Sequence, residues 1–283
     1  MKNHQEKIIE KSILIVAFST VFILFLITLF IFKEGLPFIL NNGLTRLFFS
    51  TNWSPSDGSY GIIPMLIGSL SITFGALILG VPLGVACAIY LAEFSSKTLR
   101  NILKPMIELL AGIPSVVYGF IGMIFLAPVI RSYFGGPGLS ILTASIVLGI
   151  MILPTIISIS LDALLMLPRS YKEGSMALGA TQWQTVTGVL LPAARSGILA
   201  GVILGMGRAI GETMAVIMVT GNSVKVPSSF IDSTRTLTAN IALEMGYAIG
   251  EHRQALFATA IILFVFIIIL NILDMKIIKK RRI

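Results

Sequence analysis

Long apolar runs separated by short clusters of charged residues are the dominant pattern along this chain. Five stretches hold no charged residue at all: residues 12–32, 58–92, 109–130, 132–161 and 254–273. A sixth apolar stretch, residues 197–221, holds two ionisable side chains, Arg208 and Glu212. About 20 apolar residues let a helix cross the hydrocarbon core of a bilayer. The pattern therefore predicts an all-α integral membrane protein with six transmembrane helices.

Composition agrees with this prediction. Hydrophobic residues make up 55% of the 283 residues against 12% charged, and the mean hydropathy is +0.94. A soluble core of this size needs no uncharged run long enough to span a membrane. The one cysteine, Cys87, lies inside such a run, so neither a disulfide framework nor a CxxC metal or redox site is possible. We expect no cofactor.

Lysine and arginine are distributed unequally between the segments that join the predicted helices. Fourteen of the 21 lie on the side that holds both termini, six lie on the other side, and Arg208 lies within a span. Because basic residues concentrate in cytoplasmic segments, both termini are expected in the cytoplasm. The net charge of +8 then reflects membrane topology rather than nucleic-acid binding.

The first predicted helix follows several lysines, as the apolar region of a signal peptide would. Its uncharged run of 21 residues is too long for that region, and Phe32-Lys33-Glu34-Gly35 offers no small-residue cleavage pattern. We interpret it as a retained anchor, followed by a polar extracytoplasmic segment over residues 33–60. The expected division is residues 1–60 for the anchor and this segment, 61–275 for the transmembrane domain and 276–283 for a basic cytoplasmic tail.

Glycine and proline recur inside the predicted spans. Gly201 and Gly205, and again Gly207 and Gly211, have the GxxxG spacing that lets helices approach closely. Proline at membrane depth kinks a helix and frees a carbonyl group that neighbours must satisfy. Close packing is the favoured interpretation of these positions, and a hinge is compatible with it.

The predicted loop over residues 162–195 contains a spaced motif. It reads Glu173-Gly174-Ser175, then Gly179, then nine residues, then Val189-Leu190-Leu191-Pro192. This resembles the EAA motif of permease subunits of ATP-binding-cassette (ABC) importers, which is EAA, three residues, Gly, nine residues and I-x-L-P. Gly174 and Ser175 stand where alanines are usual. The resemblance implies that this segment couples to an ATPase through Glu173, Gly179, Leu191 and Pro192.

The same loop has a physical interpretation of its own. We expect a short helix after Pro168, with Glu173 near its start, where the positive end of the helix dipole favours a carboxylate. Gly179 then permits a turn before a second helical piece that contains Trp183. An ordinary amphipathic loop at the membrane surface is the alternative, and the resemblance favours a coupling helix.

Further strings narrow the resemblance. Residues 88–93 (AIYLAE), 107–119 (IELLAGIPSVVYG) and 207–216 (GRAIGETMAV) are similar to the PstC-type permeases of phosphate importers. The similarity extends from about Trp53 to Asp274 and implies the MetI-like fold of type I ABC importers. It also implies a heterodimer with a PstA-like permease, a dimer of a PstB-like ATPase and a PstS-like phosphate-binding protein. A PstA-like sister subunit, or a permease for sulfate or molybdate, is the alternative.

The chain carries no nucleotide-binding signature of its own. It contains no GxxxxGK[ST] string, and the dipeptide Gly-Lys does not occur. Because that loop is what cradles phosphates in P-loop ATPases, we expect a non-catalytic membrane subunit whose partner hydrolyses ATP.

Arg208 and Glu212 are the expected substrate-pathway residues. Arginine offers a planar fork of donors that matches phosphate oxygens. Arg208 follows Arg195 by thirteen residues, or about 20 Å along a helix, which puts it near mid-membrane. Four residues further on, Glu212 is expected to neutralise Arg208 when no anion is present. A static structural ion pair at this spacing is the alternative.

Other function classes fit less well. An intramembrane hydrolase is disfavoured, because both histidines lie outside the predicted spans and no GxSxG string occurs. A passive channel needs no ATPase-docking segment, so the EAA-like spacing argues against it. Ser69, Ser71 and Thr73 are expected to bond within the bundle rather than to line a path. The outer loop over residues 222–253 is expected to be solvated, with a possible short helix at residues 236–245.

Overall fold

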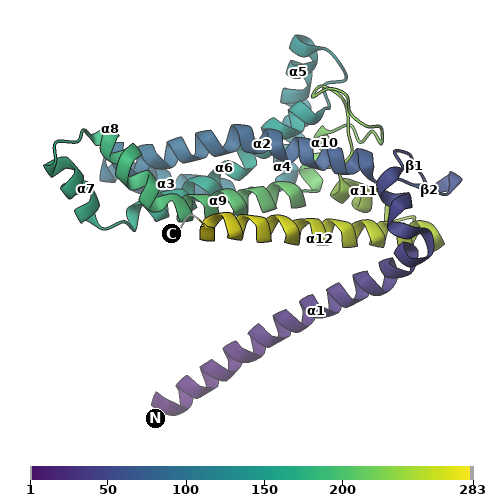
Figure 1. The fold of residues 1–283 in the computed structure, drawn as a ribbon, viewed down its shortest axis with the longest axis horizontal. Helices are drawn as coiled ribbons and strands as arrows, with labels where there is room; N and C mark the ends of the chain where they lie inside the picture. The colour runs from purple at the N-terminus through teal and green to yellow at the C-terminus, as the bar shows by residue number, and fades with distance from the viewer. Residues whose placement is uncertain (1, 281–283) are drawn as a thin grey trace.

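The structure, a computed structural model, is a bundle of helices and describes residues 2–280. α2, α6, α9 and α12 run alongside one another, and α7 and α8 cap one end of the bundle (Figure 1). The elements are α1 (Lys2–Phe49), β1 (Trp53–Ser54), the 3₁₀ turn η1 (Pro55–Asp57), β2 (Ser59–Tyr60), α2 (Ile63–Ile89), the π-helical turn η2 (Tyr90–Phe94), α3 (Lys97–Ala111), α4 (Ser115–Ile121), the π-helical turn η3 (Gly122–Leu126), α5 (Ala127–Phe134), α6 (Ile141–Leu165), α7 (Arg169–Ala177), α8 (Gln182–Thr185), the π-helical turn η4 (Val186–Leu190), α9 (Leu191–Gly211), α10 (Met214–Val219), α11 (Leu237–Glu244) and α12 (Gly250–Lys280).

The six predicted membrane helices are confirmed. Six segments of the described chain are long and apolar enough to cross a bilayer: Ile9–Gly43, Ile63–Phe94, Ser115–Phe134, Ile141–Leu165, Gln182–Gly211 and Gly250–Ile272. The protein is therefore a multi-pass membrane protein. The tail predicted at residues 276–283 continues α12 as far as Lys280, and residues 281–283 lie outside the described residues.

Several predicted boundaries were wrong because they followed charges alone. Residues 97–111, expected to be a loop that runs into the third span, form the amphipathic helix α3, so that span starts at Ser115. The fourth span starts at Ile141 rather than at Ser132, which belongs to α5. The fifth starts at Gln182 and ends at Gly211. Charged residues do not mark these boundaries, because Arg195 lies inside the fifth span and because the third and fourth spans begin several residues after the nearest charged residue.

The segment from Lys33 to Tyr60 is not the polar stretch that the sequence predicted. α1 continues to Phe49 and changes direction at Gly43, whose φ of 74° and ψ of 150° are not helical. Phe38, Trp53 and Tyr60 are buried in a cluster with residues of α2, α11 and α12. Trp53 pairs with Tyr60 across the short β1–β2 ladder. This segment therefore packs onto the bundle.

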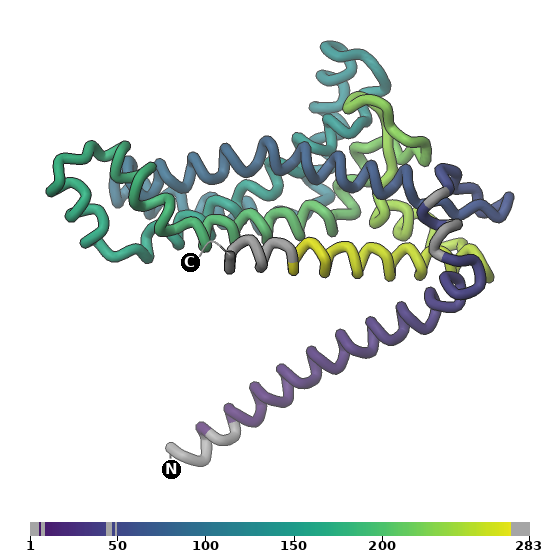
Figure 2. Tube along the Cα trace, in the orientation of Figure 1, coloured from purple at the N-terminus to yellow at the C-terminus, as the bar shows by residue number. Residues whose placement is uncertain are grey.

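The first half of α1 leaves the bundle (Figure 2). α1 crosses α12 at Gly35, where an added Cβ would lie 2.7 Å from the carbonyl carbon of Phe257. Phe30 stacks edge-on against Phe257, with ring centroids 5.5 Å apart. Before this crossing the apolar side chains are exposed, and Phe18 is 72% accessible.

Glycines bring α2, α6 and α9 into direct contact. A Cβ at Gly84 of α2 would lie 2.7 Å from Cγ2 of Ile156 on α6, and one at Gly205 of α9 would lie 3.1 Å from Cγ1 of the same residue. Gly201 lies equally close to Ile159 of α6. Helices in lipid associate through such close van der Waals packing. The predicted pair Gly201 and Gly205 therefore packs as expected. At Gly207 and Gly211, by contrast, an added Cβ would meet no atom within 4 Å.

Candidate functional site

Arg208 lies in the last turn of α9, where the negative end of the helix dipole favours a cation. Its side chain is half-buried, and Nη2 donates to the carbonyl oxygen of Ala111, at the end of α3, over 3.5 Å. This hydrogen bond is long, and the ion pairs between described residues do not include Arg208. Most N–H donors of its guanidinium are therefore available to another acceptor.

Glu212 does not pair with Arg208, in contrast to the sequence-based expectation. α9 ends at Gly211, and Glu212 has an extended backbone with φ −68° and ψ 132°. The two residues are thus not one turn apart on a continuous helix. Instead, Oε1 of Glu212 accepts a hydrogen bond from the backbone N–H of Ala215 at 3.2 Å, at the start of α10. The carboxylate stabilises the first turn of α10.

The break between α9 and α10 is held in place by α11. The hydroxyl group of Thr238 donates to the carbonyl oxygen of Glu212 at 2.9 Å, which satisfies an acceptor that the break leaves free. Irregular backbone at membrane depth occurs where protein buries it or where it lines a watery cavity. Gly207 and Gly211 lie close to Arg208 in sequence. A Cβ added at either glycine would meet no atom within 4 Å. This face of α9 is therefore uncovered by the described chain.

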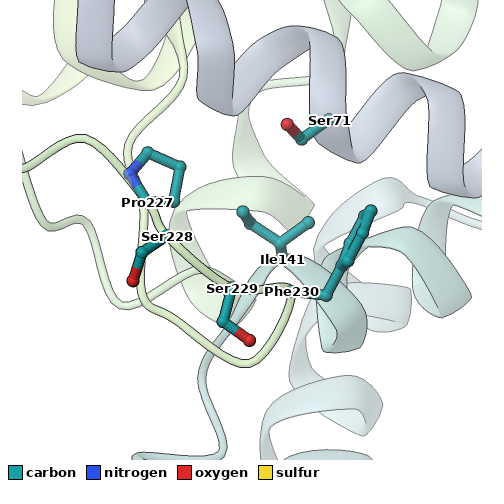
Figure 3. Close-up of a pocket in the computed structure, with 6 residues that line it drawn as sticks. All are labelled: Ser71, Ile141, Pro227, Ser228, Ser229 and Phe230. Atoms are coloured by element: carbon teal, nitrogen blue, oxygen red, sulfur yellow. The ribbon is translucent and has the colours of Figure 1, made fainter.

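The polar residues of α2 behave largely as expected. Ser69 is buried, and its hydroxyl oxygen accepts a hydrogen bond from the backbone N–H of Leu237, the first residue of α11, at 3.0 Å. Ser71 faces a small cavity of about 120 Å³ near the start of α6. Figure 3 shows Ser71 opposite Ile141 and the loop residues Pro227, Ser228, Ser229 and Phe230.

That loop is built around Asp232. Oδ2 of Asp232 accepts hydrogen bonds from the backbone N–H of Ser228 at 2.8 Å, from the Ser228 hydroxyl at 2.8 Å and from the backbone N–H of Ser229 at 2.9 Å. These bonds, those of Ser228 first, lower the pKa of Asp232 below its ordinary value. The carbonyl oxygen of Asp232 accepts from the N–H of Ile141, so the same turn caps the start of α6.

A buried carboxylate, Glu244, joins four segments at the same end of the bundle. It pairs with Arg235 at 2.6 Å and with Nε2 of His252 at 2.8 Å, and it accepts a hydrogen bond from Nε1 of Trp53 at 2.9 Å. Burial, and then the charge of Glu244, raise the pKa of Tyr247. This cluster could not be predicted from the sequence, because Trp53 lies 191 residues before Glu244. The loop over residues 222–253 was expected to be solvated, but it is in part buried, and the short helix that was the alternative within it is present as α11.

The motif at residues 173–192 forms the predicted helix-turn-helix, which we call the coupling segment (residues 169–192). α7 ends at Ala177, Gly179 takes the left-handed φ of 87°, and Thr181 begins α8 with a capping box. A side chain is strained at such a φ, so glycine suits the turn. The turn predicted at Gly179 and the second helical piece with Trp183 are confirmed.

Glu173 differs from its prediction. It is the fifth residue of α7 rather than a first-turn residue, so the dipole at the start of this helix does not account for it. Its side chain is exposed, as are the nearby apolar side chains of Met176, Leu178 and Trp183. Leu178 is 91% accessible. The tip of the coupling segment is thus an apolar surface with an acidic residue at its side.

Leu191 and Pro192 stand at the other end of the coupling segment, where α9 begins. Leu191 packs against the buried cluster that includes Leu164 of α6 and Leu190 of η4. Pro192 occupies the first turn of α9, where its missing N–H costs no hydrogen bond. The coupling segment therefore continues into α9 at these two residues without a break in the helix.

Comparison with known proteins agrees with this architecture. Residues 80–283 match the family described as the binding-protein-dependent transport system inner membrane component. The chain is 44% identical over 261 residues to the probable ABC transporter permease protein YqgH of Bacillus subtilis (strain 168), with 88% of this chain and 84% of that protein covered. It is 37% identical over 238 residues to the phosphate transport system permease protein PstC of Xylella fastidiosa, with 77% of this chain and 74% of that protein covered.

A solved structure also resembles the fold. The MetNI methionine ABC transporter in an inward-facing conformation has a chain that matches with a TM-score of 0.59 at 20% identity, and the match covers 81% of this chain and 99% of that chain. At this identity the likeness concerns the fold alone. It confirms the predicted MetI-like arrangement of six membrane helices.

Proposed function

Because the chain belongs to the binding-protein-dependent transport system inner membrane component family, and within it to the PstC-type permeases, we propose that it is the permease subunit of an ATP-driven phosphate importer. In this proposal it forms half of the pathway for inorganic phosphate. The observation that carries the proposal is Arg208, a half-buried guanidinium within a membrane helix whose only hydrogen bond to the described residues is a long one.

The chemistry of phosphate fits this arginine. A phosphate ion that leaves water needs charged donors in place of its hydration, and a guanidinium can engage two of its oxygens at once. Arg195 and Arg208 lie on the same helix, α9, so their thirteen-residue separation corresponds to about 20 Å. On this proposal, Arg208 receives phosphate at mid-membrane and Arg195 lies at the cytoplasmic end.

Glu212 belongs to the same proposed pathway through the break that it stabilises. Discontinuous helices form the substrate sites of many transporters, because their free backbone groups and helix ends face the ligand. Here Glu212 caps α10 and leaves Arg208 without a carboxylate partner. In this state Arg208 is ready for an anion, and the approach of Glu212 in another state would compete with phosphate and favour its release.

The proposed partners follow from the surfaces that the chain leaves open. The exposed tip around Glu173, Leu178 and Trp183 suits a cytoplasmic PstB-like ATPase dimer, and the uncovered face at Gly207 and Gly211 suits a homologous PstA-like permease. A PstS-like binding protein would deliver phosphate from outside, with both termini of this chain in the cytoplasm. ATP-driven movement of the ATPase would expose the pathway to each side in turn.

Substrate-dependent ATP hydrolysis tests this function. The chain, with the permease, ATPase and binding protein encoded beside it, is reconstituted in liposomes and supplied with phosphate, sulfate or molybdate. We expect phosphate alone to stimulate hydrolysis and to accumulate in the lumen. Stimulation by sulfate or molybdate instead would contradict phosphate as the substrate. Uptake that is independent of ATP would contradict the assignment as an ATP-driven importer.

A further inference from the structure

Glu93 is an acidic residue at the cytoplasmic end of α2 to which the proposed pathway assigns no role. It lies in the π-helical turn η2, and its side chain is 12% accessible. Its carboxylate pairs with Nζ of Lys172 on α7 at 2.6 Å. Its carbonyl oxygen accepts a hydrogen bond from Nε2 of Gln182, the first residue of α8, at 2.7 Å. Glu93, just beyond the end of α2, therefore contacts both short helices of the coupling segment.

Apolar contacts reinforce this junction. The ring centroids of Phe94 and Trp183 lie 6.4 Å apart. Leu91 is buried in the same cluster as Val186 and Leu190 of η4. Side chains of two π-helical turns, η2 and η4, thus belong to one buried cluster. Such turns are rare in proteins, and those that occur are often found at functional sites. The end of α2 and the coupling segment are packed as one unit.

α2 links this junction to the other end of the bundle. Glu93 and Ser69 are separated by 24 residues of continuous helix, or roughly 36 Å. At that end, Ser69 bonds to the start of α11, and Gly68 lets the loop approach so closely that an added Cβ would lie 2.6 Å from the carbonyl oxygen of Arg235. α11 in turn holds the carbonyl oxygen of Glu212 through Thr238.

We propose that Glu93 locks the coupling segment to α2, so that a displacement of the segment reaches the break at Glu212 through α2 as well as through α9. This inference rests on the proposed function. Glu93 touches neither phosphate nor ATP and is a positioning residue. A charge-assisted hydrogen bond suits the task because its strength depends on distance and direction, so it resists separation of the two parts when the ATPase reopens.

The coupling ratio, phosphate taken up per ATP hydrolysed, tests the inference in the reconstituted complex. We expect Glu93→Gln to assemble normally and to keep ATP hydrolysis, while the coupling ratio falls by roughly threefold or more, in line with the loss of a partly buried charge-assisted bond. Exchange of the charges, Glu93→Lys with Lys172→Glu, should recover most of the ratio. Asp162→Asn is the matched control, because it removes another 2.6 Å ion pair at this end, with Lys104 of α3, and should leave the ratio unchanged.

The outcomes separate a positioning role from a structural one. A purely structural pair would lower the amount of assembled complex and leave the ratio of each complex intact, which would overturn the inference. Failure of the charge exchange to recover the ratio would overturn it too. If the native complex couples phosphate uptake to ATP hydrolysis and Glu93→Gln couples equally well, this inference alone fails. If the native complex shows no phosphate-dependent hydrolysis, the proposed function fails instead.

Discussion

At the scale of single residues, Arg208 is a half-buried cation with one long hydrogen bond to the described residues. An arginine at membrane depth costs at least a few kcal/mol unless partners or water solvate it, and the 3.5 Å bond to the carbonyl oxygen of Ala111 offsets little of this cost. In Glu244, by contrast, a buried charge has an arginine, a histidine and a tryptophan as partners. The proposed role of Arg208 in anion binding rests on this difference from the fully paired Glu244.

Arg208→Gln should leave assembly intact and lower phosphate uptake by about tenfold or more, equivalent to at least about 1.4 kcal/mol. The glutamine keeps a donor but loses the charge and the fork. Because Glu212 is bonded to Ala215 instead of Arg208, the substitution strands no buried carboxylate. The measurement is uptake per assembled complex in liposomes.

The matched control for this variant is Arg195→Gln on the same helix. Arg195 is exposed near the start of α9, so its loss should change uptake little. The combined Arg208→Gln and Glu212→Gln variant should remain poorly active. Near-normal uptake by that double variant would show that the two residues act as a structural pair and would refute their place in the pathway.

At the scale of elements, glycine spacing sets how closely α9 lies against α6. Gly205→Leu should destabilise the isolated subunit by about 1–3 kcal/mol, because its side chain must displace Ile156, already 3.1 Å from the position of an added Cβ. Gly207→Leu is the control two residues away, where an added Cβ meets no atom within 4 Å. Thermal unfolding of the purified subunit in detergent compares the two. Equal unfolding temperatures would contradict the packing derived for α6 and α9.

Much of the element order could be predicted from the sequence, since a transmembrane helix is specified by a local run of apolar residues. The helix-turn-helix around Gly179 was also local, because Pro168 and Gly179 punctuate it. The break at Glu212 was not predictable in this way. The apolar pattern continues across residues 209–219, and the break depends on Thr238, which lies 26 residues away in sequence. For the same reason, neither the Glu244 cluster nor the contact of Glu93 with Lys172 was foreseen.

At the scale of the whole molecule, several apolar surfaces lack a partner within the described chain. Among them are the first half of α1, the face of α9 at Gly207 and Gly211, and the tip of the coupling segment. A lipid bilayer accounts for an apolar surface within a span, whereas Met176 and Leu178 at the tip lie between the fourth and fifth spans. A chain with this distribution is built to function inside a larger complex.

The tip provides a test of both docking and orientation. Cysteines at Ser175 and Ala177, in a variant whose Cys87 is replaced by serine, should crosslink to the ATPase, with Ala177 the more efficient because its side chain is exposed. Position 175 is only half-exposed and its side chain faces Thr185, 3.0 Å from the serine hydroxyl, so a cysteine there should react more slowly. Labelling of these cysteines by an impermeant reagent from outside intact cells would overturn the cytoplasmic placement.

A second prediction at this scale concerns nucleotide. The purified single subunit should neither bind ATP at the affinity typical of ATPases nor hydrolyse it, because the chain contains no phosphate-cradling loop. Equilibrium binding of a fluorescent ATP analogue, with the assembled complex as the positive control, provides the measurement. Saturable, specific binding by the subunit alone would contradict the proposed division of labour.

The turn at Asp232 carries a dependence on pH. Because the folded turn lowers the pKa of this carboxyl group, its contribution to stability is present above the ordinary aspartate pKa of about 3.9 and is lost as the pH falls through the lower folded value. We expect proteolysis within residues 222–236 to accelerate in strong acid, and Asp232→Asn to remove much of that acceleration. An unchanged acid response in this variant would contradict the role of Asp232.

This turn also lies on the side of the membrane that a cell cannot buffer, given the proposed orientation. The carboxyl group of Asp232, whose turn caps the start of α6, thus experiences the acidity of the habitat, while the coupling segment remains at the steady pH of the cell interior. Because the hydrogen bonds from Ser228 and Ser229 lower the pKa of Asp232, this turn should keep its shape in acidic surroundings where an unbonded aspartate on the same surface would already be protonated.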